Sequence, residues 1–80
     1  MDIRKVFGAN VRRFRIAAGL SQEAVAERMG VDRAYISAVE RGIQNATLIL
    51  VWETAQALKV CPAQLLDETA IAPADEAGTA

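Results

Sequence analysis

Residues 30–42 read GVDRAYISAVERG, and this stretch decides how the rest of the chain is interpreted. Gly30 and Gly42 enclose eleven residues, and glycine readily adopts the left-handed backbone conformation that ends a helix. Ile36 and Val39 provide an apolar side at helical spacing. The stretch therefore predicts a short helix between the two glycines. Its other side carries small or polar residues and one cation: Arg33, Ala34, Ser37 and Ala38.

Helical signals continue on both sides of this stretch. Apolar spacing and capping residues predict helices over about 3–18 and 21–29 before it. After it, Thr47 is expected to cap a helix reaching Leu58, and Cys61-Pro62 to begin a short helix ending near Leu66. The apolar face predicted for the fourth helix consists of Leu48, Val51, Trp52, Ala55 and Leu58. The fold class is predicted to be all-α, a compact five-helix bundle.

Composition limits the function classes. Eighty residues suffice for one small domain. No apolar run is long enough for a membrane span, and the N-terminus lacks a signal peptide's apolar core, so a cytoplasmic location is expected. The chain has one cysteine, Cys61, and no histidine, which removes intrachain disulfides, the usual zinc sites and histidine-based catalysis. No cofactor, metal or small-molecule ligand is expected. Two roles are open for Cys61: it is either a small apolar residue or a redox switch that forms an intersubunit disulfide.

The charge is unevenly distributed along the chain. Residues 1–60 carry nine basic and six acidic groups, whereas residues 61–80 carry four acidic groups and no basic ones. After about residue 68 the sequence loses helical periodicity and mixes Ala, Pro, Gly and acidic residues. We therefore predict a folded domain over 1–68 and a disordered acidic tail over 69–80.

The second and third predicted helices have the features of a helix-turn-helix unit. In such a unit two helices are joined by a short turn with glycine, and the second helix can enter the DNA major groove. Ala26 is small where the helices must cross closely, and Gly30 makes the turn. The apolar side is supplied by Val25, Met29, Val31, Ile36 and Val39.

The sequence LSQEAVAERMGVDRAYISAVERG over 20–42, with TLILVWETAQALKVCPAQLL over 47–66, resembles the phage-repressor and Cro type of helix-turn-helix domain. This type is commonly called the XRE family, with a lambda-repressor-like fold, and the resemblance covers about residues 3–68. DRAYISAVERG also resembles the controller proteins of restriction-modification systems. The resemblance implies a five-helix, usually dimeric domain that binds double-stranded operator DNA and regulates transcription.

The resemblance also implies roles for individual residues. Gln22 matches a glutamine that anchors a DNA phosphate, although it could be an ordinary exposed polar residue. The groove-facing positions of the recognition helix are matched by Arg33, Ala34, Ser37 and Ala38. Arg33 suits bidentate pairing with guanine, and a phosphate contact is the alternative. Tyr35 could donate to a phosphate or serve as partly buried packing.

Further positions follow the same pattern. The resemblance places Arg41, Gln44 and Asn45 where relatives contact phosphates. Arg15 and Glu40 correspond to a buried ion pair in relatives, the alternative being two solvated charges.

An apolar excess in the fourth helix predicts a partner surface. We expect a twofold dimer through the fourth and fifth helices, and the alternative is denser packing of the core. The residues assigned to this interface are Ile43, Ile49, Leu50 and Leu65.

The main hypothesis is a sequence-specific transcriptional regulator that binds an inverted-repeat operator as a homodimer through the helix at 32–41. The alternative is an antitoxin-like or other protein-binding module, with DNA binding secondary. An enzyme is the third class, and it is disfavoured because no histidine is available to activate a nucleophile.

Overall fold

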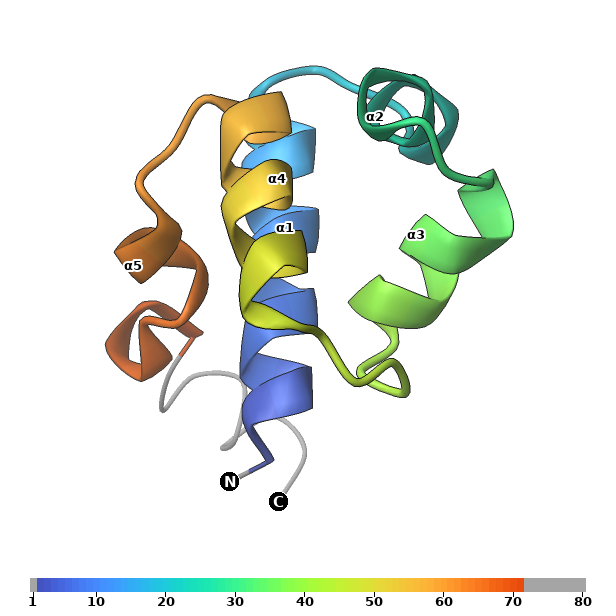
Figure 1. The fold of residues 1–80 in the computed structure, drawn as a ribbon. Coiled ribbons are helices and arrows are strands. Elements are labelled where there is room, and N and C mark those ends of the chain that lie inside the picture. The colour runs from blue at the N-terminus through green and yellow to red at the C-terminus, as the bar shows by residue number, and fades with distance from the viewer. Residues whose placement is uncertain (1, 72–80) are drawn as a thin grey trace.

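The computed structural model describes residues 2–71, which contain five α-helices, a final 3-10 turn and no strand. The elements are α1 (Ile3–Ala17), α2 (Gln22–Met29), α3 (Arg33–Glu40), α4 (Leu48–Leu58), α5 (Pro62–Leu65) and η1 (Glu68–Ile71). The helices α1 and α4 lie side by side, with α2 and α3 on one flank and α5 on the other (Figure 1). The predicted all-α, five-helix bundle is confirmed. Within 2–71, no helix is both long and apolar enough to cross a membrane.

Side-chain caps fix most of the helix starts. The hydroxyls of Ser21 and Thr47 each accept a hydrogen bond of 3.0 Å from the backbone N–H three residues later. Asp2 caps α1 by accepting a 2.9 Å hydrogen bond from the N–H two residues later. Asp32 stands at the N-cap position of α3, but its side chain makes no capping hydrogen bond. The helix predicted between Gly30 and Gly42 is therefore present, and it begins without a side-chain cap.

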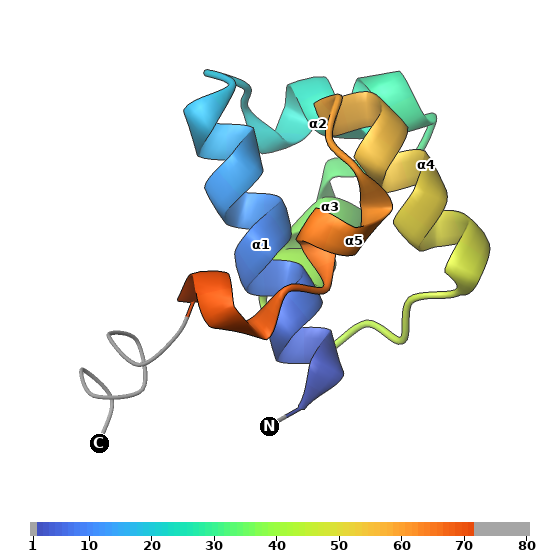
Figure 2. The same ribbon diagram turned by 90° about the vertical axis from the view of Figure 1, so that its left-hand side faces the viewer.

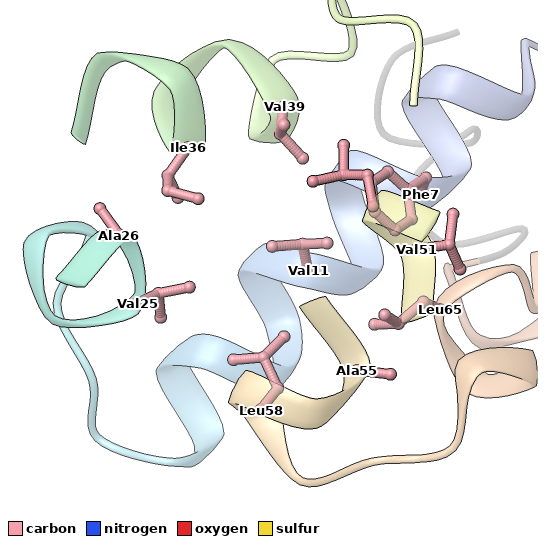
Figure 3. Close-up of a cluster of buried hydrophobic side chains, with 11 residues drawn as sticks. Phe7, Val11, Val25, Ala26, Ile36, Val39, Val51, Ala55, Leu58 and Leu65 are labelled. Carbon is pink, nitrogen blue, oxygen red and sulfur yellow. The ribbon is translucent and has the colours of Figure 1, made fainter. Parts of the chain in front are cut away.

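All five helices contribute to one core (Figure 3). Val11, Val25, Ile36, Leu58 and Leu65 come from α1 to α5 in that order, and each is at most 5 % exposed. Burying an aliphatic side chain of this size stabilises a fold by roughly 1.5–3 kcal/mol. The core therefore holds α2 and α3 against the rest of the bundle.

The helix α4 presents a different side to the core from the one predicted. Leu48 is 82 % exposed and Trp52 is 55 % exposed, although both were assigned to the apolar inner face. Leu50, which was assigned to a dimer interface, is instead buried in the core. The observed inner face consists of Leu50, Val51, Thr54, Ala55, Ala57 and Leu58.

Helix α1 passes very close to the C-terminal end of α3, and a glycine permits it. Gly8 is buried, and a Cβ added to it would lie 2.8 Å from the carbonyl oxygen of Glu40 and closer still to that of Val39. Real Cβ atoms essentially never come within 3.0 Å of another heavy atom in this way. The position of α3 on α1 therefore requires the absence of a side chain at residue 8.

A buried amide ties the C-terminal segment to α1. The Nδ2 of Asn10 donates to the carbonyl oxygens of Leu65 and Asp67, both at 3.1 Å, and its Oδ1 accepts from Arg13 at 3.2 Å. The turn η1 then packs against α1 (Figure 2). The helical turn η1 ends at Ile71, and the domain boundary at residue 68 stays a prediction. The rest of the predicted tail, 72–80, lies outside the described residues.

Candidate nucleic-acid interface

The turn between α2 and α3 has the geometry that a helix-turn-helix unit needs. Gly30 adopts the left-handed conformation, with φ 70° and ψ 32°, and its N–H donates back to α2. The N–H of Val31 donates to the carbonyl of Ala26 at 3.0 Å, which closes the turn. Ala26 is itself almost completely buried, so its small side chain lets the two helices pack closely.

The outer side of α3 carries the residues expected to face DNA. Arg33 and Ala34 are exposed in the first turn of the helix, whereas Ser37 and Ala38 are half-buried one turn later. Tyr35 is partly buried and packs against the core. The structure thus brings four predicted groove-facing residues onto one helix, and it favours the packing role for Tyr35.

A buried ion pair joins α1 to the end of α3. The Nε of Arg15 lies 2.6 Å from Oε2 of Glu40, and its Nη2 donates to Oε1 at 3.1 Å. Their side chains are only 14 % and 4 % exposed. The remaining Nη1 of Arg15 donates to the carbonyl of Leu20 at 3.0 Å. The predicted pair is confirmed, and the alternative of two solvated charges is wrong.

Gln22 takes part in the same cluster, which sequence reasoning did not predict. Its Nε2 donates to Oε1 of Glu40 at 3.0 Å, and the residue is half-buried at the start of α2. Gln22 is therefore held in place by the protein rather than extended freely into solvent.

The loop after α3 holds the other expected phosphate-binding residues. Arg41 and Asn45 are exposed, and Gln44 is half-buried. The Oδ1 of Asn45 accepts a weak hydrogen bond of 3.4 Å from Arg4, a contact missed from sequence because the two residues are far apart in the chain.

Hydrogen bonds from Arg4 to the Asp2 carboxylate lower the pKa of Asp2 to about 2.

The residues expected at a dimer interface separate into two groups. Ile43 and Ile49 are exposed, at 59 % and 65 %. Leu50 and Leu65 are buried in the core of the single chain, so their assignment to a partner surface is wrong. The exposed apolar residues of α4 are Leu48, Ile49 and Trp52, and we call these three residues the α4 outer face.

The architecture and the outward side of α3 define a helix-turn-helix DNA-binding domain, the class to which this chain is assigned. The chain belongs to the helix-turn-helix family HTH_3, which it matches over residues 11–66. Members of this family are non-enzymatic regulators that bind DNA, so the chain is a DNA-binding transcriptional regulator and not an enzyme.

Individual relatives agree with this assignment. The chain is 45 % identical over 69 residues to an uncharacterised helix-turn-helix transcriptional regulator, y4dJ, of Sinorhizobium fredii, covering 86 % of this chain and 90 % of that protein. It is 41 % identical over 71 residues to the control protein C.BamHI of Bacillus amyloliquefaciens, covering 88 % of each.

A solved structure supports the fold independently. The restriction-modification controller protein C.AhdI of Aeromonas hydrophila matches with a TM-score of 0.74 and 42 % identity, over 78 % of this chain and 94 % of that one.

Proposed function

We propose that this protein is a sequence-specific transcriptional regulator that binds an inverted-repeat operator as a homodimer, with α3 in the major groove. The observation that carries the proposal is the outer side of α3, where Arg33 stands exposed beside small side chains. Small residues allow a helix to approach base edges closely, and an arginine can pair bidentately with guanine. The expected site of action is the cytoplasm, where the chain would meet its operator.

Phosphate contacts would set the register of this helix on DNA. Gln22 stands at the start of α2, where helix-end N–H groups favour an anion. Arg41, Gln44 and Asn45 follow the recognition helix and are proposed to contact the backbone on the other side of it. Contacts of this kind position a protein without reading sequence.

Dimerisation is proposed to occur through the α4 outer face, with Ile43 at its edge. An exposed apolar patch of this kind on a small domain is typical of a partner surface. A twofold axis there would set two recognition helices about 34 Å apart, one turn of DNA, so that each half of an inverted repeat meets one subunit.

A controller of a restriction-modification system is a narrower candidate. It is favoured because C.BamHI and C.AhdI, both named as control or controller proteins, are each more than 40 % identical to this chain. The alternative is a protein-binding module. It would have the same fold, but its main partner would be another protein and DNA binding would be secondary.

The decisive experiment is selection of tight binders from random double-stranded DNA, followed by affinity measurements across salt concentrations. The expected result is an inverted repeat whose affinity falls steeply with salt, with a log–log slope of about −0.9 for each phosphate contacted. Selection of a single half-site would contradict the dimer. Failure to select any sequence, with no affinity even at low salt, would favour the protein-binding alternative.

A further inference from the structure

The carboxylate of Glu40 is shared between α1 and α2. It accepts two hydrogen bonds from Arg15, of 2.6 and 3.1 Å, and one of 3.0 Å from Nε2 of Gln22. Arg15 also holds the carbonyl of Leu20, two residues before Gln22. The start of α2 is therefore fixed both through its backbone connection and through its first side chain.

The chemistry of the carboxylate determines which end of the Gln22 amide faces it. An ionised carboxylate only accepts hydrogen bonds, so the NH₂ end of the amide must point toward Glu40 and the oxygen must point away. An NH₂ group has two N–H donors, and the bond to Glu40 uses one of them. The second N–H remains for an acceptor outside the protein, such as a phosphate oxygen.

The charge of the cluster suits such a contact. A free carboxylate beside a phosphate would repel it, but Arg15 neutralises Glu40 with a two-point, largely buried interaction. Glu40 can therefore orient Gln22 without placing an unbalanced negative charge against the DNA backbone.

From this geometry we propose that Glu40 is a positioning residue for DNA binding: it holds the Gln22 amide with an N–H directed at a backbone phosphate. The inference rests on the proposed function, because it assigns a mechanism to the phosphate contact of Gln22. An amide that is already oriented loses less side-chain entropy when it binds. Releasing it would also populate the flipped amide, whose oxygen faces and repels the phosphate.

The test is a double-mutant cycle on the selected operator, using wild type, Gln22→Ala, Glu40→Gln and the double variant. Gln22→Ala is expected to weaken binding on the order of tenfold in wild type, as for loss of a hydrogen bond to a charged group. In the Glu40→Gln background the same change should cost only about twofold, because residue 40 then offers one acceptor oxygen in place of two and Arg15 competes with Gln22 for it.

Gln44→Ala provides the matched control, since Gln44 is also proposed to contact phosphate but belongs to the loop after α3. Glu40→Gln alters the charge near both glutamines. If it acted only through charge, the fold loss of affinity caused by Gln22→Ala would be the same with and without Glu40→Gln, and so would the loss caused by Gln44→Ala. An equal cost of Gln22→Ala in both backgrounds overturns the inference. No DNA binding by wild type at all overturns the proposed function itself.

A measurement on the free wild-type protein covers the case in which Glu40→Gln fails to fold. Side-chain ¹⁵N relaxation is expected to show the Gln22 amide as rigid as the backbone, in contrast to the amide of the exposed Gln56 on α4. A Gln22 amide as mobile as that of Gln56 would overturn the inference.

Discussion

Gly8 of α1 lies directly against the carbonyl oxygen of Val39 in the last turn of α3. The backbone of α1 thereby supports the C-terminal end of the helix proposed to read DNA. The orientation of that helix depends on how closely α1 can approach it, in addition to the core packing shared by all five helices.

Gly8→Ala is expected to lower the free energy of unfolding by about 1–3 kcal/mol, the usual cost of forcing an extra group into a packed site. The added Cβ would collide with backbone oxygens, which cannot rotate away as a flexible side chain could. Urea unfolding measures the loss, and affinity for the selected operator should fall as α3 shifts. A gain in stability, as alanine gives at an open helical position, would contradict the close contact.

Glu40→Ala is expected to cost ~3–5 kcal/mol, as when one partner of a buried ion pair is removed. Arg15 would keep its charge in a site where its side chain is only 14 % exposed, and it would lose two hydrogen bonds. Thermal and urea unfolding provide the measurement. Glu53→Ala on the exposed side of α4 is the control and should change stability by less than about 0.5 kcal/mol. Equal, small losses in both variants would show that the pair is not important for stability.

Arg33→Ala is expected to relax sequence preference at one base pair in each half-site, with a loss of about 1–3 kcal/mol in discrimination. The residue is exposed in the first turn of α3, where its guanidinium can reach base edges. Binding should be measured against operators substituted at each position. Uniform weakening with unchanged preference would make Arg33 a phosphate contact instead. Arg12→Ala, an exposed position on α1, should leave the preference unchanged.

Ile49→Lys is expected to convert the proposed dimer to a monomer in sedimentation at micromolar concentration. The residue is 65 % exposed in the single chain, so lysine costs little within the subunit, whereas a twofold interface would place two like charges together. Ala17→Lys adds the same charge at an exposed position of α1, outside the proposed interface, and should leave the dimer intact. Wild type sedimenting as a monomer would count against the interface.

Asp2 provides a pH-dependent test of the α1 cap. Its carboxylate binds Arg4, and the pKa falls from 3.8 to about 2. Because the pKa is lower in the folded state, ionised Asp2 stabilises the fold above about pH 4, and that contribution is lost as the pH falls to about 2. The melting temperature of wild type should therefore be slightly higher than that of Asp2→Asn at about pH 6, and the two melting temperatures should coincide near about pH 2. A difference that persists at the lowest pH would show that the charge is not responsible.

Local signals were enough to predict the helices of this fold. Capping residues and glycines act within one turn of the chain, so the helix ends that they mark could be predicted correctly. The residues concerned are Ser21, Thr47, Gly30 and Gly42. Even the buried pair of Arg15 and Glu40 was predicted correctly, through the family resemblance rather than through spacing.

Features that depend on tertiary packing were not predictable in the same way. The run LILVW is apolar at every position, so its periodicity does not specify which side of α4 faces inward. Packing against α1, α2 and α5 turned Leu50 inward and left Leu48 and Trp52 outside. Gly8 and Asn10 were missed because the groups that explain them are more than thirty residues away in sequence.

The amide of Asn10 also constrains the order of events during synthesis. Its two acceptors are the carbonyls of Leu65 and Asp67, which are translated only after α1 to α4. Until then Asn10 lacks these partners and the core lacks Leu65, so the bundle is incomplete. Arrival of the C-terminal segment is therefore the step that completes the domain, and a nascent chain stalled before residue 65 should be recognised by chaperones or proteases as unfinished.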